Sequence, residues 1–87
     1  MREHCKCVLK GFFHTYLVET RASLSLTQAK MAQRLAMDER SYTDLDHGKS
    51  LCSATTLVLF LLYCCADPME FLNQLRAELE SEANHVA

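Results

Sequence analysis

Apolar residues recur every three or four positions along much of this chain. That spacing places them on one face of an α-helix, so it predicts a helical protein. Only two glycines and one proline occur in the 87 residues, which disfavours a turn-rich sheet protein. We therefore predict one compact all-α domain with five helices, at 8–23, 27–36, 38–47, 53–65 and 67–82, a frayed N-terminus at 1–7 and a tail at 83–87.

Helix signals support these boundaries. Thr27, Asp38 and Asp67 are residue types whose side chains accept a hydrogen bond from the first turn of a helix. Pro68 follows Asp67 and fits the first helical position. Gly48 is a natural stop for the helix at 38–47.

The apolar faces predict the core. Each of four helices carries one apolar stripe, which we expect to be buried. The predicted inward residues are Val8, Leu9, Phe12, Phe13, Tyr16 and Leu17; Met31, Ala32 and Leu35; Tyr42 and Leu45; and Phe71, Leu72, Leu75 and Leu79.

The helix at 53–65 is apolar on nearly every side. Leu59, Leu62 and Tyr63 cannot all point inward together with Phe60 and Leu61, so part of this helix must lie outside the core. Either the first helix or a second copy of the chain covers that patch. We favour a homodimer through the fourth and fifth helices over a monomer.

Charge and apolar run length bear on partners and location. The net charge is −2, which counts against binding to nucleic acid. The charge is uneven: residues 1–50 hold eight Lys/Arg and six Asp/Glu, a net +2, while residues 51–87 hold one and five, a net −4. The longest apolar run, 57–66, is shorter than the ~20 residues of a membrane span. The polar N-terminus is unlike a signal peptide, so we expect a cytoplasmic protein without membrane contact.

Other candidate chemistry is sparse. The five cysteines are expected to be free thiols in a reducing compartment, with Cys52 an exposed spectator. His4, Cys5 and Cys7 could ligate zinc, but a structural zinc site needs four ligands and no second ligand pair is evident. We predict no metal, no cofactor and no small-molecule substrate. No Gly-rich phosphate loop or catalytic cysteine signature is present, so we do not expect an enzyme.

The segment from Arg21 to Lys49 has a more specific pattern. An arginine lies six residues before Thr27-Gln28, an apolar–Ala pair and Leu follow, and an acidic residue lies two before Gly48-Lys49. This pattern resembles the lambda-repressor/Cro-like helix-turn-helix family, often named after the xenobiotic response element. The resemblance extends over about residues 12–75. The residues that carry it include Arg21, Met31, Ala32, Leu35, Asp46, Ser53, Thr56 and Leu57.

The resemblance implies a lambda-repressor-like, DNA-binding transcriptional regulator with a helix-turn-helix at its second and third helices. The recognition helix, 38–47, would lie in the major groove of double-stranded DNA. Arg21 and Asp46 would form a salt bridge that fixes its angle. The implied DNA-binding residues are Glu39, Arg40, Thr43 and Asp44 at base edges, and Lys49 and Ser50 at the backbone. Gln28 would contact the backbone or a base-contacting residue.

The sequence departs from the family pattern at two places, and the first keeps an alternative open. The recognition helix is acidic, and carboxylates near phosphates are repelled. Glu39 and Asp44 could instead accept hydrogen bonds from the amino groups of cytosines. Alternatively, this surface could face a basic protein. The alternative is therefore a protein–protein interaction module of the same fold that has lost DNA binding. Ala36 stands where the family commonly has glycine, which costs about 1 kcal/mol if the turn needs a positive φ.

Overall fold

The computed structural model describes residues 1–86, with side chains described as far as Ser81. These residues form five helices and no strand, which confirms the all-α prediction. The radius of gyration is 13.1 Å, close to the roughly 12 Å of a compact chain of this length. The helices are α1 (Arg2–Ser23), α2 (Gln28–Arg34), α3 (Glu39–Asp46), α4 (Ala54–Tyr63) and α5 (Pro68–Val86).

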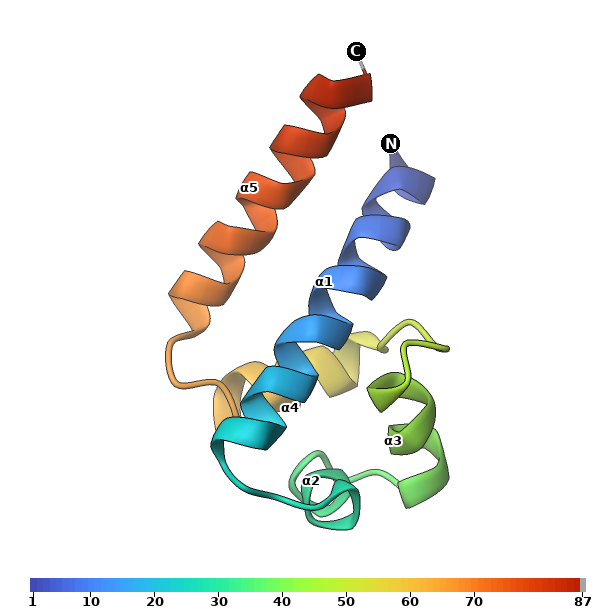
Figure 1. Ribbon diagram of the computed structural model, residues 1–87, viewed down its shortest axis with the longest axis vertical. Coiled ribbons are helices and arrows are strands. Elements are labelled where there is room, and N and C mark those ends of the chain that lie inside the picture. Colours follow the sequence, from blue (N-terminus) through green and yellow to red (C-terminus); the bar gives the residue numbers. More distant parts are fainter. Residues whose placement is uncertain (87) are drawn as a thin grey trace.

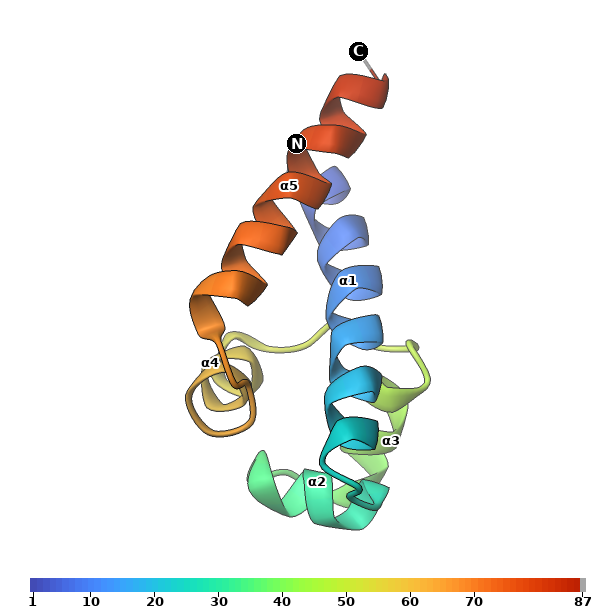
Figure 2. The ribbon, with the colours of Figure 1, turned by 60° about the vertical axis from the view of Figure 1, so that its left-hand side comes forward.

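The short helices form a base from which the two long helices extend. Helices α2, α3 and α4 lie at one end of the molecule, and α1 and α5 run antiparallel towards the other (Figures 1 and 2). Helix α2 packs on α3, and α1 contacts both α3 and α5. The beginning of α1 and the end of α5 therefore lie at the pole opposite α2 and α3.

Side-chain caps begin four of the helices at the predicted places. The hydroxyl of Thr27 accepts from the backbone N–H of Lys30 at 3.2 Å, and Asp38 Oδ2 accepts from Ser41 N–H at 3.0 Å. Ser53 and Asp67 make the equivalent bonds for α4 and α5, each at 3.1 Å. Each bond satisfies a backbone N–H that has no partner within the helix.

Helices α1, α2 and α3 end in the same kind of turn. The residues after their C-caps, Ser25, Ala36 and Gly48, have φ values of 56°, 54° and 73°. In each case the next N–H bonds back to a carbonyl five residues earlier, as from Lys49 to Asp44 at 2.8 Å. This is the Schellman arrangement, which favours glycine at the left-handed position. Ala36 thus adopts the positive φ that the sequence analysis identified as costly.

The predicted frayed N-terminus at 1–7 is wrong. Helix α1 begins at Arg2, so it starts well before Val8. His4 and Cys5 are half-buried, and Lys6 pairs with Glu3 at 3.4 Å across one helical turn. The apolar stripe does not reveal this extension because its residues are mostly polar. At the other end α5 continues through Val86, beyond the predicted end at 82, and the side chains of the predicted tail lie outside those described.

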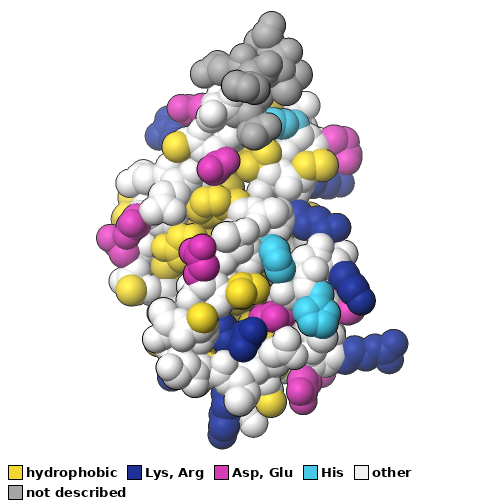
Figure 3. Space-filling view, viewed as in Figure 1, with side chains coloured by type: hydrophobic (Ala, Val, Ile, Leu, Met, Phe, Trp, Pro, Cys, Tyr) yellow, Lys and Arg dark blue, Asp and Glu magenta, His cyan; other side chains and the backbone are white. Residues whose placement is uncertain are grey.

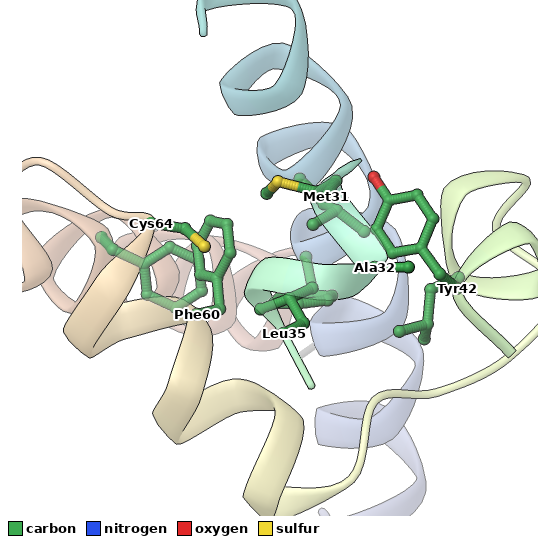
Figure 4. Close-up of a cluster of buried hydrophobic side chains, with 10 residues drawn as sticks. Met31, Ala32, Leu35, Tyr42, Phe60 and Cys64 are labelled. Atoms are coloured by element: carbon green, nitrogen blue, oxygen red, sulfur yellow. The ribbon is translucent and has the colours of Figure 1, made fainter. Parts of the chain in front are cut away.

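The core joins all five helices. Figure 4 shows Met31 and Ala32 of α2 and its C-cap Leu35 between Phe60 of α4 and Tyr42 of α3. Behind them lies an aromatic cluster with edge-to-face contacts, which such rings favour. The ring centroids of Phe13 and Phe60 are 5.2 Å apart, and those of Tyr16 and Phe71 are 4.8 Å apart. The fully buried predicted residues are Phe13, Leu17, Met31, Ala32, Leu35, Tyr42, Leu45 and Phe71.

One predicted core residue lies outside. Leu72 is 43% exposed, because Phe71 beside it occupies the inward position and successive helical residues point about 100° apart. Helix α4 behaves as expected, since several of its apolar side chains remain uncovered. Four large apolar residues of α4 and α5 are more than half exposed, and we call them the α4–α5 patch: Val58, Leu62, Tyr63 and Met69. None of the described helices combines the length and apolar character of a membrane span.

Candidate functional site

A buried carboxylate, that of Asp46, is the centre of the most connected polar cluster. Its Oδ1 accepts from Arg21 Nε and from the Tyr42 hydroxyl, both at 2.9 Å. Its Oδ2 accepts from Gln28 Nε2 at 3.0 Å and from Arg21 Nη2 at 3.4 Å. Asp46 is only 6% exposed, and these four bonds compensate the cost of burying its charge. We call these four residues the Asp46 cluster.

The donors come from three different helices. Arg21 lies in the last turn of α1, Gln28 is the first residue of α2, and Tyr42 lies one turn before Asp46 on α3. Arg21 Nη1 also donates to the carbonyl of Leu26 at 3.2 Å, which fixes the α1–α2 turn. The cluster therefore holds α3 in one orientation against α1 and α2.

The protonation behaviour of the cluster follows from this geometry. Burial raises the pKa of Asp46, but the donors from Arg21, Tyr42 and Gln28 outweigh it and hold the pKa below its usual value. The bond to Asp46 raises the pKa of Arg21. Burial, and then the bond to Asp46, raise the pKa of Tyr42. The cluster thus holds one ionised pair and a neutral phenol near neutral pH.

The remaining predicted residues of α3 divide into two groups. Glu39 and Arg40 lie at the start of the helix and are exposed. Thr43 is half-buried, and its hydroxyl donates to the carbonyl of Glu39 at 2.8 Å. Asp44 is also half-buried, and it lines a hollow of about 320 Å³ between α3 and the loop before α4.

The loop after α3 holds the two predicted backbone-contacting residues. Ser50 lines the same hollow as Asp44, whereas the side chain of Lys49 is exposed beside it. The structure therefore brings Asp44 and Ser50 to one hollow and leaves Glu39, Arg40 and Lys49 open to solvent. Figure 3 shows Lys/Arg, Asp/Glu and His side chains interspersed on this lower part of the molecule.

Two residues of the cluster have roles that the sequence analysis missed. Gln28 was assigned to DNA by resemblance alone, yet its amide nitrogen donates to Asp46. Tyr42 was identified only as a core residue. The signal that could have found its second role is a tyrosine one turn before a buried acid, because a buried phenol needs a hydrogen-bond partner.

Comparison with known protein families, with curated proteins and with solved structures finds no match for this chain. The assignment of a function therefore depends on the geometry and chemistry of the chain itself.

The cysteines and histidines whose side chains are described give no second candidate site. Among the described residues, no group of three or more His, Cys, Asp or Glu side chains could hold a metal ion. Cys52 is half-buried, contrary to the expected exposure, because the hollow beside α3 encloses it. Burial raises the pKa of the Cys52 thiol and of the Cys64 thiol, which disfavours the nucleophilic thiolate.

Proposed function

We propose that this protein is a transcriptional regulator that binds double-stranded DNA, with α2 and α3 as a helix-turn-helix and α3 in the major groove. The observation that supports this most is the Asp46 cluster. A recognition helix must be presented at a fixed angle, and three helices are tied to the buried carboxylate at the end of α3. The exposed beginning of α3 would then reach the base edges.

The exposed residues suggest distinct roles. Arg40 has the planar donor group that pairs with guanine, and Glu39 can accept from the amino group of cytosine. Lys49 would contact phosphate in the loop after α3, where it fixes register without reading sequence. Gln28 would orient α3 through its hydrogen bond to Asp46. Only its second amide N–H would remain to contact the DNA backbone.

We further propose that two copies associate through the α4–α5 patch. Its four large apolar side chains are each more than half exposed. To read successive major grooves, such a dimer would need its two α3 helices about 34 Å apart. Sedimentation velocity should show a dimer for the natural chain and a monomer for Leu62→Glu. A natural chain that remains monomeric at high concentration would refute this arrangement.

Duplex binding tests the main proposal. Fluorescence anisotropy with a random-sequence duplex should show binding at 50 mM salt that weakens steeply by 200 mM. Arg40→Ala and Lys49→Ala should each weaken binding severalfold. Arg76→Ala on α5 removes another exposed cation, one that pairs with Glu80 far from α3, and is the control. Absence of binding at low salt, or equal losses in all three variants, would refute the proposal.

A protein-binding module is the second candidate function. Asp38 and Glu39 at the start of α3, with Asp44 one turn on, give this surface more acid than base. The charge of such a surface is complementary to that of a basic protein and not to that of a phosphate backbone. If the anisotropy of the duplex does not change on addition of the protein at any salt concentration, this second candidate is favoured.

A further inference from the structure

A groove lies between α1 and α5, away from α2 and α3. It has a volume of about 650 Å³, and its lining on α1 extends from His4 to Glu19. At 1.5 Å per residue this span is about 22 Å, or four turns of helix. A groove this long suits an elongated occupant better than a compact small molecule.

Apolar side chains line part of the groove, together with the polar His4, Thr15 and Gln74. Val8, Phe12 and Tyr16 recur every fourth residue on α1, and each is only half-buried by α5. Gly11 opens the wall further, because a Cβ at this position would meet no heavy atom within 4 Å. Figure 3 shows apolar side chains along the strip between α5 and α1. This regular spacing matches the apolar stripe of another helix.

The rim of the groove is acidic. Glu19 on α1 and Glu78 on α5 both line it, and both are exposed. Neither takes part in an ion pair among the described residues, and no Lys or Arg of that part of the chain lines the groove. Lys10 lies on the other side of α1, beside Gly48. The occupant that complements these charges is cationic.

We propose that the α1–α5 groove binds a basic amphipathic helix of a partner protein. The α5 helix of a second copy is a poor fit, because it carries Glu70, Glu78 and Glu80 against Arg76 alone over the described side chains. An anionic membrane surface is repelled by the same carboxylates. The proposal uses no residue of α2 or α3, so it stands or fails independently of DNA binding.

A labelled peptide tests the proposal on the full chain. The probe is a fluorescein-labelled helical peptide of about 15 residues, with Leu at i, i+4, i+7 and i+11 and Lys elsewhere. The matched peptide has Glu in place of Lys. Fluorescence anisotropy at low salt should show saturable one-to-one binding of the Lys peptide and none of the Glu peptide. Failure of the Lys peptide to bind, or equal binding of both peptides, would overturn the proposal.

Variants locate the binding. Gly11→Arg should abolish it, because a long cationic side chain would occupy the groove, while Gly11→Ala should preserve it. Both remove a glycine from a helix interior, so neither is expected to impair folding. Glu19→Gln with Glu78→Gln should weaken binding about fivefold. Glu80→Gln removes one charge from α5 outside the groove lining, where Glu80 pairs with Arg76, and it should leave binding within about twofold.

Three results would contradict the assignment. Binding unchanged by Gly11→Arg would place the peptide elsewhere. An equal loss in Glu80→Gln would indicate diffuse attraction to acidic α5. Self-association of the natural chain that Gly11→Arg abolishes would make a second copy the occupant, and would overturn the partner class proposed.

Discussion

The Tyr42 hydroxyl donates to Oδ1 of Asp46 at 2.9 Å, and the same oxygen accepts from Arg21 Nε. A residue assigned to the apolar core is thus part of the polar cluster that orients α3. Tyr42 is fully buried, and its hydroxyl would lose its hydrogen-bond acceptor if Asp46 were removed. The packing of α3 and its polar attachment therefore depend on each other.

Removing Asp46 should be far more damaging than removing the Tyr42 hydroxyl. Asp46→Ala leaves a buried phenol, Gln28 and Arg21 without their shared acceptor, and we expect the free energy of unfolding to fall by about 3 kcal/mol. Tyr42→Phe removes one donor and should cost about 1 kcal/mol. Urea unfolding measures both. Equal losses would show that the cluster contributes little beyond the packing of α3.

Acid should weaken the same cluster. The folded-state pKa of Asp46 is lowered, so the stabilisation is present above its unfolded value, about 3.9, and is lost as pH falls through the folded value. The natural chain should exceed Asp46→Asn in unfolding free energy at pH 7. This difference should shrink steadily below pH 4, as measured by urea midpoints at pH 7, 4 and 3. A difference that stays constant over this range would contradict the lowered pKa.

Ala36→Gly should stabilise the protein. Ala36 has a φ of 54° after the C-cap of α2, a conformation that glycine adopts without steric cost. We expect a gain of up to about 1 kcal/mol in thermal or urea unfolding. Ala77→Gly, in the regular interior of α5, is the matched control and should cost about 1 kcal/mol. A loss at both positions would show that the turn after α2 does not require its positive φ.

Gly48→Ala should destabilise the protein for two separate reasons. Its φ is 73°, and a Cβ would approach the ring of His14 to 3.3 Å. We expect a loss of about 1–2 kcal/mol. A double-mutant cycle with His14→Ala separates the two causes, because it should recover only the part due to the ring contact. Complete recovery would mean that the positive φ itself costs nothing here.

Local signals in the sequence predicted most of the fold. Caps at Thr27, Asp38 and Asp67 act within one turn, so they place helix starts without tertiary information. The spacing of apolar residues predicted the buried faces of α2 and α3, because this spacing is also a local property of each helix. It failed at residues 2–7, where the chain is helical without an apolar stripe, and at Leu72, where two adjacent apolar residues compete for one inward position.

The candidate site was less accessible to such reasoning. The pairing of Arg21 with Asp46 was an expectation from resemblance, and the structure places the two in an ion pair. The bonds from Gln28 and Tyr42 depend on how three helices meet, which no short-range pattern specifies. The groove between α1 and α5 could not be predicted from the sequence, because its two walls come from opposite ends of the chain.

The antiparallel course of α1 and α5 has a practical consequence for experiments. Because the start of α1 lies at the pole opposite α3, a linker attached at Met1 would hold the molecule by its far end. If the protein is immobilised in this way on a sensor surface, α3, the proposed recognition helix, would face the flowing sample.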